Sequence, residues 1–429
     1  MPDSINRREF INHSAMTGVA AAGLSLADVA RANSANNKVV VGIMGLGRGR
    51  SLAAGFARQP NVEVKYVCDA DTRRLSGGIK AVEGIAGNTP EGVQDFRRML
   101  DDKSVDALVC AAPNHWHAPA TILACSAGKH MYVEKPCSHN GEEGELMVQA
   151  ARKNKRAVQM GTQRRSGPGT NQAIAKLREG VIGKVYHARC WYDNTRPSIG
   201  DGVVADVPKE LNYELWQGPA PHRPYKSNVV HYNWHWRWHW GNGELGNNGV
   251  HTLDLCRWGM GVDYPDRVSS SGGRYHYDDD QETPDTHTVG FEFDGVGEIT
   301  WQGKSCNRYS RGGFVTFYGT QGAMELDSNG KHRIYDQRGK LVNETSSAGL
   351  GDAEHILNFL TAIREDKPLE LNAEILEGHK STLLCHLGNI AYRVGRSLAC
   401  DKKNGHIVND PKAMALWGRD YQKGWEPKV

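Results

Sequence analysis

The sequence predicts an α/β domain with a doubly wound parallel sheet, followed by an α+β domain with a mostly antiparallel, open sheet. Up to residue 161, short apolar runs alternate with helical stretches, as in parallel sheets whose two faces are covered by helices. From residue 162, alternating strands and loops rich in Gly, Asn and Asp predict a sheet with one exposed face. At roughly 100 to 200 residues per domain, the 429 residues suffice for two domains, which we place at 38–161 and 162–429.

The first 32 residues have the form of a twin-arginine export leader. The pair Arg7-Arg8 precedes a weakly apolar stretch over 15–30 and a small-residue cleavage candidate at 30–32. An amphipathic helix or a membrane anchor is the alternative, but the stretch is short of the roughly 20 strongly apolar residues that a spanning helix needs. We therefore expect the twin-arginine machinery to export the folded protein to the periplasm, and we expect no membrane-embedded mature form.

The composition favours small molecules as partners. The 52 basic and 49 acidic side chains leave a formal net charge of +3, and no dense Lys/Arg block stands outside the leader, so we expect no nucleic-acid partner. The nine cysteines stand singly, without the paired spacing of metal ligands, which indicates neither a disulfide framework nor a metal centre. Free thiols are consistent with folding in a reducing compartment before export.

Apolar periodicity places the elements of both domains. In the first domain, strand-like and helical runs alternate over Val39–Met44, Leu52–Arg58, Val62–Cys68, Phe96–Leu100, Val105–Ala111, Ala118–Ala127, His130–Val133, Glu142–Arg152 and Ala157–Met160. In the second domain, strands are predicted at His187–Tyr192, His287–Phe293, Glu298–Gln302, Phe314–Tyr318 and Ala323–Leu326. Two amphipathic helices, Ala353–Arg364 and Glu374–Val394, should pack on a sheet face or back on the first domain.

A glycine-rich turn after the first strand predicts a dinucleotide site in a Rossmann-type domain. The first two glycines allow a tight turn and let the backbone approach a pyrophosphate at the helix N-terminus, although a Gly-x-Gly alone also fits a plain strand-helix turn. The third glycine comes one residue early, so the local turn should differ and an arginine at position 48 or 50 should lie beside the phosphates. The residues expected to hold the cofactor here are Gly45, Leu46, Gly47, Arg48, Gly49 and Arg50.

Asp69 strengthens the dinucleotide interpretation and bears on the choice of cofactor. It ends the second strand about 20 residues after the glycines, where a carboxylate accepts hydrogen bonds from the adenosine ribose and repels a 2′-phosphate. This position favours NAD over NADP. Arg73 and Arg74 follow closely and keep NADP open as the less favoured alternative.

Three motifs resemble those of the Gfo/Idh/MocA family, and the likeness covers nearly the whole mature chain. They are Ala-Pro-Asn-His-Trp-His at 112–117, Gly-Lys-His-Met-Tyr-Val-Glu-Lys-Pro at 128–136 and Gly-Val-His-Thr-Leu-Asp at 249–254. The resemblance implies an NAD(P)-dependent dehydrogenase that acts mainly on sugars and polyols. It also implies a homodimer or homotetramer, for which the open sheet of the second domain would provide a surface.

The resemblance implies roles for the residues of the first two motifs. Pro113, Asn114 and His117 would line the cofactor together with Glu134, and a cis proline would direct Lys135 toward cofactor and substrate. The residue pattern agrees, because a lysine at the carboxyl end of a parallel strand lies near the crevice where ligands bind. The alternative is an ordinary surface lysine in a loop.

His251 is the expected proton acceptor. An imidazole titrates near neutrality and can take a proton from a sugar hydroxyl as hydride leaves the same carbon. On a helix, positions 247, 251 and 254 share one face, and the alternative is a packed histidine bonded to Asp254. Many relatives carry Asp where this chain has Asn247, and because an amide cannot accept a proton, His251 and Lys135 must do more of the acid-base work. Asn247 can still bind a hydroxyl, and Asp254 should orient the helix or the imidazole.

The stretch 231–240 packs four tryptophans and three histidines into ten residues and predicts a carbohydrate pocket. Indole faces stack on sugar rings while imidazoles bind hydroxyls, although a buried aromatic cluster is the alternative. The spacing of His235 and His239 lacks the glutamate of a zinc motif, so we expect no metal. The predicted substrate contacts are Trp234, His235, Trp236, Trp238, Tyr192, Arg164 and Arg165, with Gln163 assigned to the nicotinamide.

The sequence therefore predicts an enzyme that oxidises a sugar or glycoside hydroxyl, with Lys135 polarising the oxygen and His251 accepting the proton. A cofactor carried through export would have to be retained, which favours chemistry that restores its redox state. A redox-neutral NAD-dependent glycoside hydrolase is thus an alternative, in which oxidation, elimination, water addition and re-reduction follow one another. A non-catalytic sugar- or nucleotide-binding protein is the second alternative.

Overall fold

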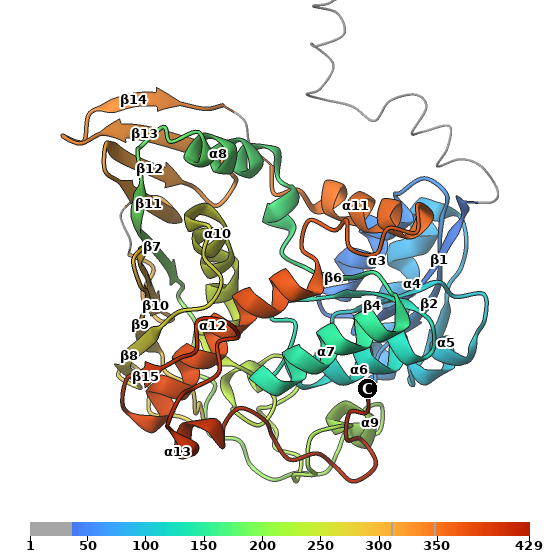
Figure 1. The fold of residues 1–429 in the computed structure, drawn as a ribbon. Coiled ribbons are helices and arrows are strands. Elements are labelled where there is room, and N and C mark those ends of the chain that lie inside the picture. The colour runs from blue at the N-terminus through green and yellow to red at the C-terminus, as the bar shows by residue number, and fades with distance from the viewer. Residues whose placement is uncertain (1–36, 310–311, 347–348) are drawn as a thin grey trace, which may run out of the picture.

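The computed structural model describes residues 37–309, 312–346 and 349–429 (Figure 1). The expected leader at 1–32 lies outside these residues. Within the described part of the chain, no helix has both the length and the apolarity that crossing a bilayer requires.

The first domain is the predicted doubly wound sheet. Its six parallel strands run in the order β3-β2-β1-β4-β5-β6, so the winding reverses between β1 and β4. This reversal opens a crevice at the carboxyl ends of the two strands, where ligands bind in such folds. The strands are β1 (Val39–Met44), β2 (Val62–Cys68), β3 (Glu91–Val93), β4 (Ala107–Cys110), β5 (His130–Val133) and β6 (Val158–Met160).

Helices cover both faces of this sheet. Those that follow its strands are α3 (Gly49–Ala57), α4 (Thr72–Ala86), α5 (Arg97–Asp101), α6 (Asn114–Ser126) and α7 (Gly141–Asn154). Of these, α4 was not predicted. Gly78 and Val82 of α4 are buried, and Leu75 and Ile79 pack beside them, so α4 has an apolar face that was overlooked in the sequence. The helix is bounded by an Asp71 cap and by Gly87 in the left-handed conformation.

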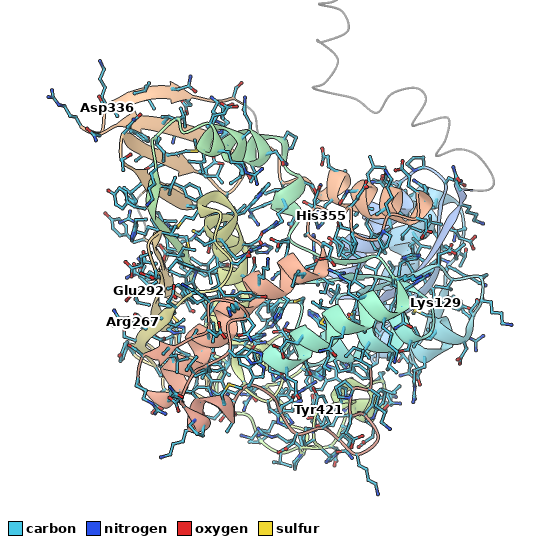
Figure 2. The ribbon with its side chains drawn as sticks, in the orientation of Figure 1. Lys129, Arg267, Glu292, Asp336, His355 and Tyr421 are labelled. Atoms are coloured by element: carbon cyan, nitrogen blue, oxygen red, sulfur yellow. The ribbon has the colours of Figure 1, made fainter. Side chains whose placement is uncertain are left out.

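A helix from the end of the chain completes the first domain. α11 (Asp352–Arg364) lies beside α3 in Figure 1, and Phe359 packs edge-on against Phe56 and Tyr132 at ring distances of 6.3 and 5.9 Å. Figure 2 shows His355 of this helix at the junction of the two domains, where its ring contacts the Ser166 hydroxyl at 2.7 Å. Of the two placements expected for this helix, packing back on the first domain is confirmed.

The second domain contains the predicted open sheet. Its nine strands run in the order β14-β13-β12-β11-β7-β10-β9-β8-β15, and all neighbours are antiparallel except β7 and β10. The inner face buries Phe291, Trp301 and Phe317, while the outer face carries the ion pair Arg267 and Glu292 (Figure 2). The strands are β7 (Val185–Asp193), β8 (Arg267–Gly273), β9 (Thr286–Phe293), β10 (Gly297–Lys304), β11 (Val315–Gly319), β12 (Gly322–Leu326), β13 (His332–Asp336), β14 (Leu341–Glu344) and β15 (Leu398–Ala399).

Helices on the inner side join this sheet to the first domain. In Figure 1, α12 runs from the β8 end of the second sheet toward the first domain, where it contacts α7 and β6. The remaining elements are η2 (Gln163–Ser166), α8 (Pro168–Arg178), α9 (Tyr213–Gln217), η3 (Asn233–Trp236), η4 (Leu245–Gly249), α10 (Val250–Met260), α12 (Ile375–Val394) and α13 (Pro411–Met414).

A long, largely irregular stretch, residues 194–244, reaches from the second domain to the first, and we call it the crossing segment. It is tied to the end of β2 by the bonds Asn212 N to Ala70 O, at 2.9 Å, and Thr72 N to Glu210 O, at 3.0 Å. Its apolar side chains, among them Trp216 and Trp234, form a small core against Ala70. The crossing segment therefore lies against the nucleotide end of the first domain.

The nine cysteines are all free thiols, as expected. Eight are buried and Cys306 is half-buried. They act as small apolar residues of the core.

Candidate active site

A cavity of about 500 Å³ opens where the two domains meet, at the carboxyl ends of β1, β4 and β5. The turn after β1, the motif after β4, the lysine after β5, the crossing segment and the start of α10 all contribute to its wall. Most predicted site residues meet here. They are Gly45, Gly47, Arg48, Asp69, Pro113, Asn114, His117, Glu134, Lys135, Gln163, Trp234, His235, Asn247 and His251.

The turn after β1 has the geometry that a dinucleotide needs. Gly45 has a φ of +86°, and a Cβ there would lie 2.5 Å from the backbone nitrogen of Ala112, so only glycine fits. A Cβ on Gly49 would lie 3.2 Å from Ile43, so Gly49 provides the close helix-to-strand contact that position 50 usually provides. The expected difference in the turn is thus a shift by one residue. Arg50 packs along α4 beside Gly77 and does not line the cavity.

Arg48 holds three parts of the chain together at this turn. Its Nε donates to Glu134 at 3.2 Å, and its Nη2 donates to Asp352 of α11 at 2.8 Å. Burial opposes its charge, but the two carboxylates raise the pKa of the guanidinium, which stays cationic. The positive charge expected beside the phosphates is therefore present and already oriented.

The far end of the cavity fits an adenosine ribose. Asp69 is 8% exposed and accepts from the backbone nitrogens of Leu46, at 2.8 Å, and Asp71, at 3.0 Å. Arg74 lies 4.0 Å from the Asp69 carboxylate, whereas Arg73 turns away and pairs with Asp71. A carboxylate acceptor at the end of β2 fits the ribose hydroxyls of NAD, and the adjacent turn, which only glycine can form, fits its pyrophosphate.

Lys135 lies at the other end of the cavity. The bond between Lys135 and Pro136 is cis, as the resemblance implied. Its Nζ donates to the backbone oxygen of Asn247 at 2.6 Å and to the side-chain oxygen at 3.2 Å. Burial lowers the pKa of the ammonium, and the attraction of Glu134 offsets this only in part.

His251, on the first turn of α10, faces the same space. Its Nδ1 is buried without a hydrogen-bond partner among the described residues, so Nε2 is the nitrogen that reaches the cavity. Burial lowers the pKa of the imidazole, and the neighbouring charges of Arg164 and Lys135 lower it further. Asp254 does not bond this ring, because Arg165 and Ser381 occupy its oxygens.

His235 is a second neutral imidazole in the cavity. Its Nδ1 lies 2.6 Å from the backbone oxygen of Tyr232, which can only accept, so Nδ1 carries the hydrogen and Nε2 a lone pair. The ring stacks on Trp234 at a centroid distance of 3.6 Å. Burial lowers the pKa of His235 to about 3.

Several predicted contacts lie elsewhere. The rings of Trp236 and Tyr192 lie 4.6 and 6.0 Å from the guanidinium of Arg196. An ion pair with buried Glu244 fixes this guanidinium, and its positive charge attracts the aromatic faces. Arg164 lies over Phe314.

Arg165 is likewise absent from the cavity wall. It is 5% exposed, and its ion pair with Asp254 neutralises a charge that burial would otherwise make costly. Trp238 lines a different cavity.

Two contacts of the cavity had no clear signal in the sequence. Asp352 bonds Arg48 across 304 positions, in a helix that looked merely amphipathic. His231 belongs to the aromatic stretch, but its partner Asp71, at 2.8 Å, lies in the first domain. Only the three-dimensional path of the crossing segment brings them together.

Comparison with known proteins identifies both domains. The family model described as the NAD-binding Rossmann fold of an oxidoreductase family matches residues 37–162, and that of the C-terminal alpha/beta domain matches residues 199–427. The first domain is thus an NAD-binding Rossmann domain.

Curated relatives match over part of their length. Glycosyl hydrolase family 109 protein 2 of Shewanella sp. (strain ANA-3) is 28% identical over 44% of this chain and 46% of its own. Levoglucosan dehydrogenase of Pseudarthrobacter phenanthrenivorans is 27% identical over 52% of this chain and 51% of its own. The chain therefore spans about half the length of the curated relatives it matches.

Solved structures share the fold over most of the chain. A levoglucosan dehydrogenase in complex with NADH superimposes with a TM-score of 0.65 at 18% identity, covering 84% of this chain and 99% of its own. The WlbA dehydrogenase of Bordetella pertussis, in complex with NADH and UDP-GlcNAcA, gives 0.64 at 20% identity, covering 85% and 99%.

Proposed function

Because this chain belongs to the Gfo/Idh/MocA oxidoreductase family, we propose that it oxidises a CH–OH group of a sugar or glycoside with NAD. One observation carries the proposal. The amine of Lys135 and the imidazoles of His251 and His235 share a single cavity with the dinucleotide turn. A hydroxyl placed among them has a donor, a proton acceptor and a neighbouring nicotinamide.

Bound NAD supplies the hydride acceptor, and the protein supplies everything else. Lys135 Nζ gives a hydrogen bond to the substrate hydroxyl oxygen and so stabilises the negative charge that develops there. His251 takes the hydroxyl proton at Nε2, because its lowered pKa keeps the imidazole uncharged at neutral pH. Trp234, with His235 stacked on it, provides an apolar face and a hydrogen-bonding edge for a sugar ring.

A redox-neutral glycoside hydrolase is the second candidate function, and His235 favours it. After oxidation, a ketone acidifies the neighbouring C–H, and removal of that proton expels the glycosidic oxygen. Water then adds at the vacated carbon, and the hydride returns to the carbon it left, so the net reaction is hydrolysis. This series of reaction steps needs a second proton acceptor beside His251. We assign that role to Nε2 of His235.

The crossing segment supports retention of the cofactor. The ring of its His231 lies 2.8 Å from the Asp71 carboxylate, and its Leu211 forms a β-bridge with the same residue, so a segment of the second domain covers the part of the cavity where the adenosine would bind. A cofactor held in this way would survive the export that the leader at 1–32 implies. We propose a periplasmic protein that carries its NAD with it and associates as a homodimer or homotetramer through the outer face of the second sheet.

Two assays test these proposals. Denaturation of the protein purified from its exported form should release NAD in near-stoichiometric amount, and release of no dinucleotide would contradict retention. The native protein is then incubated with chromogenic glycosides and no added NAD. Aglycone release without accumulating NADH supports the hydrolase, whereas turnover only with added NAD supports a net dehydrogenase. No turnover of any sugar or glycoside under either condition would contradict both.

A further inference from the structure

A second cavity, of about 450 Å³, lies behind the wall of the candidate active site. Its lining comes from the start of α7, the crossing segment, the second half of α12 and the C-terminal tail. Asn242 lines it and bonds Asn114 of the first cavity at 3.5 Å, so the two spaces are back to back. Tyr421, which follows the lining residue Asp420 in the tail, is labelled at the lower side of the molecule in Figure 2.

The lining is rich in basic groups. It contains Arg223, Arg393 and Arg419 and a single carboxylate, Asp420. Arg419 is neutralised by Glu143, to which it donates at 2.6 Å. The lining imidazoles belong to His139, His222, His239 and His386.

Two of these arginines form no ion pair among the described residues, although the carboxylate of Glu282 attracts Arg393 from a longer distance. Within the described chain, no carboxylate lies within 4.0 Å of Arg223 or Arg393. Arg393 instead lies 5.3 Å over the ring of Trp238, and Arg223 lies 5.9 Å over that of Trp240. An aromatic face orients a guanidinium without forming an ion pair, so the N–H donors of both arginines can still bind an oxyanion.

Buried polar groups complete the lining of the second cavity. His386 is 3% exposed and shares its Nε2 with the Ser138 hydroxyl at 3.0 Å, while no bond engages its Nδ1 among the described residues. Asn389, also buried, donates to the Asn242 backbone oxygen at 3.0 Å. Burial lowers the pKa of His386 to about 3 and that of His239 to about 4, so these rings are neutral and adaptable.

We propose that this second cavity binds a small oxyanion, held by the guanidinium groups of Arg223 and Arg393 and by the imidazole of His386. The ligand class is a phosphate, sulfate or carboxylate group. Arginine forks match such groups with two parallel N–H donors, and the cavity has room for a small molecule only. The site accounts for Trp238 and His239, two residues of the aromatic stretch that the active site does not use.

Titration of the NAD-loaded protein with inorganic phosphate, sulfate or acetate at low ionic strength tests the site. We expect saturable binding by calorimetry, with chloride at equal ionic strength giving none. Arg393→Met and Arg223→Met should each weaken phosphate binding at least tenfold, and the double variant should abolish it. Arg396→Met is the matched control, because Arg396 is on the same stretch of chain but pairs with Asp410 outside the cavity.

Binding that survives in the double variant, or that weakens equally in Arg396→Met, would overturn the proposal. So would the absence of saturable phosphate binding by the unsubstituted protein. If the arginine variants fail to fold, NMR of the unsubstituted protein still decides, because phosphate should raise the pKa of His386 and His239, and constant pKa values would contradict the site.

A further arm distinguishes a free ion from an acidic sugar. Trp238→Ala should weaken phosphate and acetate binding by a similar factor in either case, because the ring orients Arg393. If the ligand is an acidic sugar, glucuronate should bind more tightly than acetate and lose that advantage in Trp238→Ala. Equal affinities for glucuronate and acetate identify a free ion.

Discussion

Lys135 donates to both oxygens of Asn247, across 2.6 and 3.2 Å, and so joins the end of β5 in the first domain to η4 in the second. An ammonium has three N–H donors, and two are used here, which leaves one for a substrate oxygen. The contact also explains how the chain manages without an aspartate at position 247. Its amide oxygen orients the lysine without adding a charge, and the pKa of the lysine stays low.

Replacing Lys135 by alanine should abolish turnover while NAD remains bound. The substitution removes the donor that stabilises the developing charge, a loss of roughly 10² to 10⁴-fold in kcat. Steady-state kinetics and dinucleotide content of the purified variant measure both effects. Lys153→Ala, at an exposed position on α7, is the control and should have the turnover and the NAD content of the unsubstituted protein. Unchanged turnover in Lys135→Ala would remove Lys135 from the mechanism.

Asn247→Asp should shift the alkaline limb of the activity profile to higher pH. The lysine acts as a charged donor, so activity is lost as pH rises through its pKa, which burial lowers. A carboxylate at hydrogen-bond distance stabilises the ammonium and raises that pKa, by roughly 1 to 3 units for a close ion pair. The pH dependence of kcat in the two proteins measures the shift. An unmoved limb would show that Lys135 does not titrate in the observed range.

Arg48 and Arg50 form a matched pair for testing the cofactor turn. Arg48→Met leaves Glu134 and Asp352 without their partner and should reduce retained NAD several-fold. Because Arg48 is 43% exposed, the loss in unfolding free energy should be small, roughly 1 kcal/mol. Arg50→Met, two residues along the chain and outside the cavity, should change neither the NAD content nor the unfolding free energy. Equal NAD content in the two variants would contradict the assigned role of Arg48.

β1, β2 and β5 have the expected bounds. β1 and β5 are nearly continuous apolar runs, as parallel strands covered on both faces require, whereas Glu63 and Lys65 interrupt β2, whose valines still mark it as a strand. β14 was missed since all four of its residues are exposed, and β8 because Ser and Gly fill most of it. Pairing with a neighbouring strand, which local sequence does not reveal, makes these segments strands.

The site was predictable where a short motif encodes backbone geometry or charge. Gly45, Asp69 and Lys135 lie in the cavity because each follows a strand at the same edge of one sheet. Trp236 and Arg165 have suitable side chains, but their direction is decided by Arg196 and Asp254, which lie 40 or more positions away. Residue type was therefore a good guide to chemistry and a poor guide to orientation.

His231→Ala should accelerate the release of NAD. The substitution removes the 2.8 Å bond to Asp71 that ties the crossing segment to the end of β2. Loss of a partly buried bond of about 1 kcal/mol corresponds to roughly a fivefold increase in the release rate. Stopped-flow fluorescence of dinucleotide release measures it. His276→Ala, at an exposed loop position, is the control, and identical release rates would show that the segment does not retain the cofactor.

In mild acid, protonation of the buried histidines should lower the free energy of unfolding. A substitution of His287 measures the contribution of one such ring. His287 belongs to β9 of the second sheet, and its side chain is 3% exposed. Burial alone lowers its pKa to about 4, below the value of about 6.5 in an unfolded chain. The unfolded state therefore binds the proton more readily. Stability is fully present above pH 6.5 and is lost as pH falls toward 4.

For this one group, the loss between pH 7 and pH 5 is about 2 kcal/mol in unfolding free energy. His287→Gln removes the titration, so its unfolding free energy should fall less over that interval, whatever its stability at pH 7. Denaturant unfolding of both proteins at the two pH values measures the difference. His276→Gln, which is exposed, should show the steeper dependence of the unsubstituted protein. If all three proteins lose the same free energy, the ring of His287 is protonated in the fold and hydrated, contrary to its position against Trp301.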